Sequence, residues 1–141
     1  MFEEVVYLDN AAATRLDERV LEAMKPYFFD LYAVATSQFG YSLGIDARDA
    51  LEEARAQVAA RLGAQADELV FTSGSTESSN LAIKGVAQAV GKGAGQIVVG
   101  SLEDFPVLHS ARALGKQGYD VSKVRVDETG RVDLGHLQEL V

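Results

Sequence analysis

The segment Phe71–Asn80 places a cluster of hydroxyl side chains around a single glycine. It joins the apolar stretch Glu68–Thr72, which predicts a buried strand, to a helix predicted to begin at Thr76. The first amide N–H groups of a helix have no acceptor within the helix, and the helix dipole favours negative charge there. Gly74 allows close approach to the backbone, so the turn suits a phosphate monoester. The hydroxyl donors around it are Ser73, Ser75 and Thr76.

A plain helix cap is the alternative interpretation of this turn, because Ser and Thr cap helices in many proteins. Two other phosphate-binding motifs are excluded. No lysine follows Gly74 as in the P-loop of nucleoside-triphosphate enzymes, and the sequence contains no Gly-x-Gly-x-x-Gly dinucleotide motif.

Three short apolar segments separated by helical patterns predict an α/β fold. The strands are expected at Glu68–Thr72, at Gln96–Gly100 and through Val121, Val124 and Val126. Helices are expected after Asp17 with a break near Pro26, over 45–62 with a stop at Gly63, from Thr76, over about 105–118, and after Asp133. Residues 30–44 predict a loop, and 127–130 predict a turn. The pattern indicates a three-layer, parallel-type sheet with helices on both faces. One domain is expected over 1–141, with an N-terminal arm over about 1–15 and the α/β part over about 16–141.

Composition excludes several classes of function. The net charge of -8, from 13 basic and 21 acidic residues, disfavours binding to nucleic acid and to anionic membranes. No apolar run is long enough to span a membrane, and the acidic N-terminus does not resemble a signal peptide, so a cytoplasmic protein is expected. The absence of cysteine excludes thiolate metal sites and a cysteine nucleophile within these residues. His109 and His136 are far apart in sequence, so no metal site is predicted.

Four stretches of the sequence resemble the cysteine desulfurases, which are pyridoxal-phosphate (PLP) enzymes of the class V aminotransferase group. Tyr7–Thr14, YLDNAAAT, is similar to the opening signature of that family, and Ile45–Arg55 is similar to the helix that follows. Phe71–Gly85, FTSGSTESSNLAIKG, resembles the family's PLP-phosphate loop. Asp127–Gly130 falls where the family has an Asp-x-x-Gly turn. The resemblance covers nearly all of the chain.

The resemblance implies the N-terminal part of the large domain of a fold type I PLP enzyme, which is a homodimer when complete. Such an enzyme takes sulfur from L-cysteine, leaves L-alanine and forms a persulfide on its own cysteine. The sulfur passes to an acceptor or scaffold protein for iron-sulfur cluster or thio-cofactor assembly. By this resemblance Gly74, Ser75 and Thr76 hold the cofactor phosphate, and Asn10 and Ala11 lie near the substrate.

Two positions depart from the family pattern. The family has Glu-His where this sequence has Glu103-Asp104, so Asp104 takes the place of the histidine that stacks on the cofactor ring. Aspartate has no aromatic face for stacking. The family's Gly-Asn-Pro-Ser-Ser-x-His loop aligns with 34–41, which reads VATSQFGY. His109 is five residues beyond Asp104, about 7.5 Å further along a helix, so it cannot replace the missing ring. It is interpreted as a helix surface residue, as is Lys84.

A complete enzyme of this family also needs a Schiff-base lysine, an acid beside the pyridine nitrogen and a cysteine nucleophile. The resemblance places all three beyond Val141, so the C-terminal half is missing, no catalytic residue is assigned here, and the chain is incomplete alone. Two alternatives stay open: a fragment of another class V aminotransferase-like PLP enzyme, and a non-catalytic scaffold or binding module. A further segment with a lysine and a loop cysteine would favour the desulfurase; a lysine without that cysteine would favour the first alternative.

Overall fold

The computed structural model describes residues 6–36 and 40–141 and divides the chain into two compact units, Met1–Val70 and Phe71–Val141. The first unit is helical. Its elements in chain order are α1 (Glu18–Met24), α2 (Pro26–Phe29), α3 (Ser42–Leu62) and the 3-10 helix η1 (Ala66–Glu68). Val5 and 37–39, which belong to the predicted arm and to the predicted loop, lie outside the described residues.

Local signals in the sequence set the helix ends of the first unit, as predicted. The Asp17 carboxylate accepts a hydrogen bond from the Arg19 backbone N–H at 2.8 Å and caps α1. Pro26 begins α2, so the predicted break is confirmed. α3 ends at Gly63, whose φ of 71° and ψ of 24° form a left-handed cap that glycine adopts without strain. The helix begins at Ser42, slightly earlier than expected, so Ser42–Gly44 do not belong to the loop.

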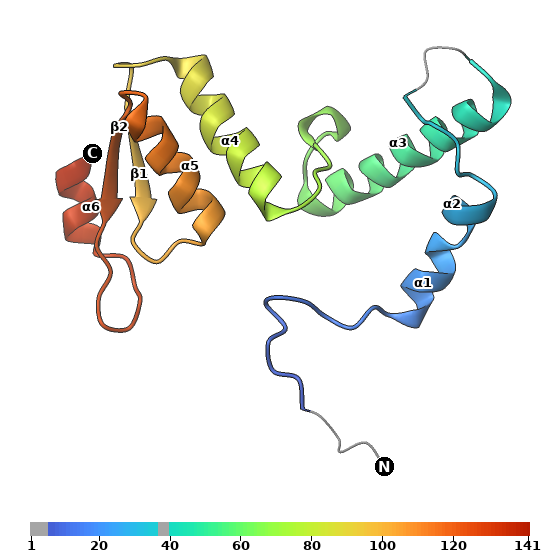
Figure 1. Ribbon diagram of the computed structural model, residues 1–141, viewed down its shortest axis with the longest axis horizontal. Helices are drawn as coiled ribbons and strands as arrows, with labels where there is room; N and C mark the ends of the chain where they lie inside the picture. The colour runs from blue at the N-terminus through green and yellow to red at the C-terminus, as the bar shows by residue number, and fades with distance from the viewer. Residues whose placement is uncertain (1–5, 37–39) are drawn as a thin grey trace. The chain divides into compact units, whose positions relative to one another are not determined.

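The second unit is a parallel α/β arrangement. Its elements are α4 (Ser75–Val90), β1 (Gln96–Gly100), α5 (Phe105–Lys116), β2 (Asp120–Val124) and α6 (Leu134–Leu140). β1 and β2 pair in parallel with Gln96 opposite Asp120, and α5 crosses between them (Figure 1). The buried apolar side chains of this unit are Ala87, Val99, Ala111, Leu114 and Val124. Since these come from α4, both strands and α5, the core lies where the two helices meet the sheet.

The predicted strand at Glu68–Thr72 is wrong. Glu68 is the last residue of η1, and Leu69–Thr72 belong to no strand. Leu69 nevertheless has an extended backbone, with φ of −100° and ψ of 126°. Val70 is 61% exposed, where the pattern predicted burial. The physical reason is that a strand needs a neighbour to exchange backbone hydrogen bonds. In residues 6–36 and 40–141, no strand lies beside this segment, so the sheet has two strands instead of three.

The last predicted strand stops at Val124, and Val126 forms an isolated antiparallel bridge with Val132. The predicted turn at 127–130 causes this reversal. Asp127 Oδ1 accepts hydrogen bonds from the backbone N–H groups of Thr129 at 2.8 Å and Arg131 at 3.0 Å. These bonds fold the chain back tightly enough to bring Val132 opposite Val126.

The helices of the second unit begin where the sequence predicted. The Asp133 carboxylate caps α6 by accepting from the His136 backbone N–H at 2.9 Å. α4 and α5 lie side by side, and both begin at the end of the unit where β1 and β2 finish (Figure 1). That end therefore collects two helix N-termini, which favour negative charge. Among the described residues, no helix is long and apolar enough to cross a membrane.

Candidate phosphate site at the start of α4

The turn before α4 depends on a backbone conformation that glycine supplies. Gly74 is the N-cap of α4, with φ of 154° and ψ of −174°, a region that residues with a side chain rarely occupy. A Cβ atom built at Gly74 would have no other atom within 4 Å, so the space in front of the turn is open. The predicted turn at the start of a helix is therefore confirmed, although an extended segment and not a strand precedes it.

Glu77 binds the Ser73 hydroxyl, which the sequence assigned to the phosphate, and also the Ser73 backbone N–H. Its Oε2 atom accepts from the Ser73 backbone N–H and from the Ser73 hydroxyl, each at 2.7 Å. The backbone hydrogen bond, with the hydroxyl bond second, lowers the pKa of Glu77 from its ordinary value of 4.5. Ser73 thus stabilises the turn and is not free to bind a ligand, contrary to the prediction from the sequence.

A second group of hydrogen bonds supports the turn from within. The hydroxyls of Thr72 and Ser78 share a hydrogen bond of 2.5 Å, and both lie within reach of the Gly74 carbonyl oxygen, at 3.3 and 3.2 Å. Since each hydroxyl has one hydrogen, one of them donates to the other and the second donates to that carbonyl. The Asn80 side-chain amide donates to the Thr76 carbonyl at 2.7 Å. The polar residues that surround the turn are therefore mostly engaged in holding its shape.

Ser75 and Thr76 are the residues of the turn left to meet a ligand. They are the first two residues of α4, and Glu77 is the third. The backbone N–H groups of these three residues have no acceptor within the helix. Both side chains are exposed, and within the described part of the chain neither hydroxyl has a recorded partner. Three amides and two hydroxyls at a helix N-terminus match the donors that a phosphate monoester requires. These five donors therefore fit the phosphate group of PLP.

Asp104 begins the neighbouring helix. It is exposed, and its Oδ1 atom accepts the Phe105 backbone N–H at 2.8 Å, which makes it the N-cap of α5. Glu103 lies over the end of β1, since a Cβ built at Gly100 would come within 2.6 Å of its carboxylate. The structure thus brings Asp104 to the same end of the unit as Gly74–Thr76 (Figure 1).

The two predicted substrate residues lie in the first unit. Asn10 and Ala11 occupy an exposed turn in which the backbone N–H groups of Ala12 and Ala13 donate to the Asp9 carbonyl at 3.1 and 3.4 Å. The first unit is not placed relative to the second, so their assignment to the substrate stays a prediction.

The two histidines do not take part in the candidate site. His109 is exposed on α5 and lies against Phe105, with the ring centroids 5.8 Å apart. His136 on α6 accepts the Arg125 backbone N–H through Nδ1 at 3.0 Å. Across 6–36 and 40–141, no cluster of three or more His, Cys, Asp or Glu side chains is arranged to hold a metal ion.

Solved structures that resemble this one define its fold class. The structure superimposes on a NifS-like protein with a TM-score of 0.86, 38% identity and coverage of 96% of this chain and 37% of that one. DndA from Streptomyces lividans gives a TM-score of 0.76 at 32% identity, covering 96% and 38%. Both likenesses support the predicted α/β fold class.

The family follows from the sequence matches. The family model described as "Aminotransferase class-V" matches residues 6–141, and the chain belongs to that family. A putative cysteine desulfurase IscS 1 of Bacillus subtilis is 41% identical over 136 residues, covering 96% of this chain and 35% of its own length. The mitochondrial cysteine desulfurase of Drosophila melanogaster is 40% identical over 136 residues, covering 96% and 29%. The chain thus spans about a third of these relatives, and the predicted resemblance to cysteine desulfurases is confirmed.

Lowering the pH is expected to open the turn before α4 locally. Because the folded pKa of Glu77 is lowered, its stabilising bonds to Ser73 are fully present above pH 4.5 and are lost as the pH falls through the folded value. Hydrogen exchange at the Ser73 amide, corrected for the intrinsic rate at each pH, should therefore accelerate below pH 4.5.

Glu77→Gln is the matched control, since it keeps an acceptor at this position and removes the titration. Asp17, Asp127 and Asp133 also have lowered pKa values, so acid weakens other parts of the chain as well. Only the difference between wild type and Glu77→Gln at the Ser73 amide tests the assignment. Equal pH dependence in the two proteins would contradict it.

Proposed function

We propose that this chain supplies the cofactor-phosphate site of a cysteine desulfurase. The observation that carries the proposal is the turn at Gly74–Thr76, where three helix amides and two hydroxyls face open space. Class V aminotransferases are PLP-dependent in general, and the curated relatives named above are cysteine desulfurases. In this proposal Gly74, Ser75 and Thr76 bind the PLP phosphate, while Asn10 and Ala11 lie near the substrate.

The bound cofactor would supply an electron sink for chemistry on the amino acid. This chain's own part is to bind and orient it: the α4 amides hold the phosphate, and Asp104 lies at the neighbouring helix start. The sequence contains no cysteine, so the sulfur-accepting thiol must come from polypeptide outside these 141 residues. The complete protein would be a homodimer that acts on L-cysteine and passes sulfur to an acceptor or scaffold protein.

Asp104 supports a second candidate, another class V PLP enzyme. Such an enzyme would use the same phosphate site but would not require the ring-stacking histidine of the desulfurases. An assay of the complete enzyme with L-cysteine separates the two candidates. Formation of alanine together with release of sulfur would indicate a desulfurase.

The domain and location of the protein are part of the proposal. One domain over 1–141, with an arm over about 1–15, agrees with the continuous family match over 6–141. A cytoplasmic location is part of the same proposal.

The chain alone, given PLP and L-cysteine, is expected to form no alanine, because it contains no cysteine and not the family's Schiff-base lysine segment. A chimera in which the chain replaces the matched third of the B. subtilis relative is expected to form alanine and to bind PLP more tightly than pyridoxal. Fluorescence titration of both cofactors measures that preference.

Replacing Ser75 and Thr76 together with alanine should reduce the preference for PLP about a hundred-fold or more, since each lost hydrogen bond to a charged group is worth about 1.5–3 kcal/mol and each 1.4 kcal/mol is about ten-fold. Ser79→Ala, on the same helix, is the matched control and should leave the preference unchanged. A chimera that binds pyridoxal and PLP equally well would overturn the phosphate site. Turnover by the isolated chain would refute the view that it is incomplete.

A further inference from the structure

His136 joins α6 to the chain segment that follows β2. Its Nδ1 atom accepts the Arg125 backbone N–H at 3.0 Å, and its own backbone N–H donates to the Asp133 carboxylate at 2.9 Å. The Asp133 backbone N–H donates to the Arg125 carbonyl oxygen at 2.9 Å, and Asp133 Oδ2 lies 3.5 Å from Arg125 Nη2. We call Arg125, Asp133 and His136 the α6 clamp.

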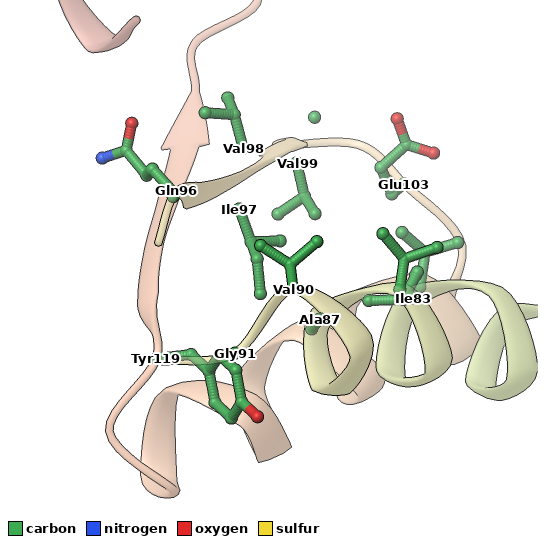
Figure 2. A pocket seen from close by; sticks show the side chains of 14 residues that line it. Ile83, Ala87, Val90, Gly91, Gln96, Ile97, Val98, Val99, Glu103 and Tyr119 are labelled. Atoms are coloured by element: carbon green, nitrogen blue, oxygen red, sulfur yellow. The ribbon is translucent and has the colours of Figure 1, made fainter. Parts of the chain in front are cut away.

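The α6 clamp holds a helix that covers one face of the sheet. Val98 points away from α4 (Figure 2), and Gly100, two residues further along β1, lies on the same face as Val98. Val124 pairs with Gly100, so it shares that face, and it is 4% exposed. Since α4 lies on the other face and α6 contacts β2, α6 is the helix that covers Val124. A helix of seven residues is not stable alone, so α6 depends on such contacts.

The α6 clamp requires a neutral imidazole. A neutral histidine has one N–H group and one acceptor nitrogen, and the bond from Arg125 uses Nδ1 as the acceptor, so the ring hydrogen lies on Nε2. Protonation places a second hydrogen on Nδ1, directed at the Arg125 N–H, and two donors do not bond to each other. Histidine is the side chain whose charge ordinarily changes between about pH 5 and 8.

The charged groups closest to this hydrogen bond are Arg125 and Asp133 themselves. The His136 backbone N–H is the main cause that lowers the pKa of Asp133 from its ordinary value of 3.8, so Asp133 stays ionised between pH 5 and 8. Attraction between Asp133 and a protonated His136 does not replace the bond to Arg125. Within the described residues, no ion pair joins His136 to another side chain. The other charged side chains of β2, of α6 and of the hairpin 126–132 between them are exposed: Asp120, Lys123, Asp127, Glu128, Arg131 and Glu139.

We infer that the α6 clamp is a pH switch, in which neutral His136 holds α6 to the end of β2 and protonated His136 releases it. The hairpin 126–132 that the clamp closes lies against Leu102, since a Cβ built at Gly130 comes 3.6 Å from its side chain. Leu102 is two residues before Asp104, so release also removes support from the segment that leads to Asp104. The switch itself does not depend on the proposed cofactor site.

The test measures hydrogen exchange by NMR at the Arg125 and Asp133 amides of the full 141-residue chain, at about pH 7.5 and about pH 5.5. After correction for the intrinsic rate, both amides are expected to exchange about two- to ten-fold faster at the lower pH, because the loss of a neutral hydrogen bond changes an opening equilibrium by about that factor. The nitrogen shifts of the His136 ring should show that its hydrogen lies on Nε2 at the higher pH.

His136→Asn is the matched variant, because asparagine keeps an acceptor on Cγ but does not titrate, so exchange at the two amides should no longer depend on pH. His136→Ala offers no acceptor and should exchange fast at both pH values. His109→Asn, which removes the other histidine of the chain, should respond as wild type does. Circular dichroism checks that each variant folds.

Three results would each overturn the switch. The first is exchange at the Arg125 and Asp133 amides of the wild type that does not depend on pH after the correction. The second is the same pH dependence in His136→Asn as in the wild type, which would assign the response to another group. The third is a ring hydrogen on Nδ1 of His136 at the higher pH, since that nitrogen could not then accept the Arg125 N–H.

Discussion

Asp104→His in the chimeric enzyme is expected to raise the turnover of L-cysteine by about a hundred-fold, the usual effect of a positioned general acid or base. Asp104 lies at the start of α5, at the end of the unit where α4 also begins (Figure 1). Its carboxylate is bound to the Phe105 backbone N–H at 2.8 Å and offers no ring to stack on a cofactor. A histidine would supply both an aromatic face and a proton donor at neutral pH.

The same substitution should lower stability, because it removes the side-chain cap of α5. Loss of an N-cap costs about 1 kcal/mol, so thermal unfolding of the variant must be measured beside its turnover. Asp104→Asn is the matched control: asparagine caps a helix as well as aspartate but carries no charge and no ring. A rise in turnover with His and not with Asn would assign the gain to the imidazole. Unchanged or reduced turnover with His would show that Asp104 does not lie at the cofactor ring.

Gly74→Ala is expected to destabilise the protein by about 1–3 kcal/mol, because alanine is strained at the Gly74 backbone angles of 154° and −174°. A Cβ at this position meets no atom within 4 Å, so the loss would come from the backbone alone. In the chimera the shifted turn should also weaken PLP binding. Denaturant unfolding and fluorescence titration measure the two effects.

Gly85→Ala is the matched control for that substitution. Gly85 lies inside α4 and a Cβ there also meets nothing within 4 Å, so alanine should stabilise the helix by about 0.5–1 kcal/mol. Opposite signs at the two glycines would support the strained turn. A neutral or stabilising Gly74→Ala would mean that the turn tolerates an ordinary residue.

Features decided by neighbours in sequence could be predicted from the sequence. Asp17, Gly63 and Asp133 fix helix ends through contacts within a few residues, and the structure has them in those roles. β1 was also predictable, because the strand that pairs with it lies within the same unit.

Features decided by distant partners could not be predicted. Glu68–Thr72 has the composition of a buried strand, but composition does not reveal whether a neighbouring strand is present. The engagement of Ser73 by Glu77 was missed for a different reason. In a capping box, a glutamate three residues after the N-cap accepts the backbone N–H of the N-cap itself. Glu77 has that position, but it binds Ser73, one residue before the N-cap Gly74.

The candidate site also has a consequence for how fast an anion reaches it. The start of α4 attracts an anion only within about one helix turn, whereas the chain's net charge of -8 repels it over about 8 Å at physiological ionic strength. The repulsion from the net charge therefore slows an approaching phosphate dianion before the N-terminus of α4 can bind it. Added salt screens the distant field more than the contact, so capture of a phosphate-bearing cofactor would speed up with ionic strength. Proteins that draw anions in with basic surfaces behave in the opposite way.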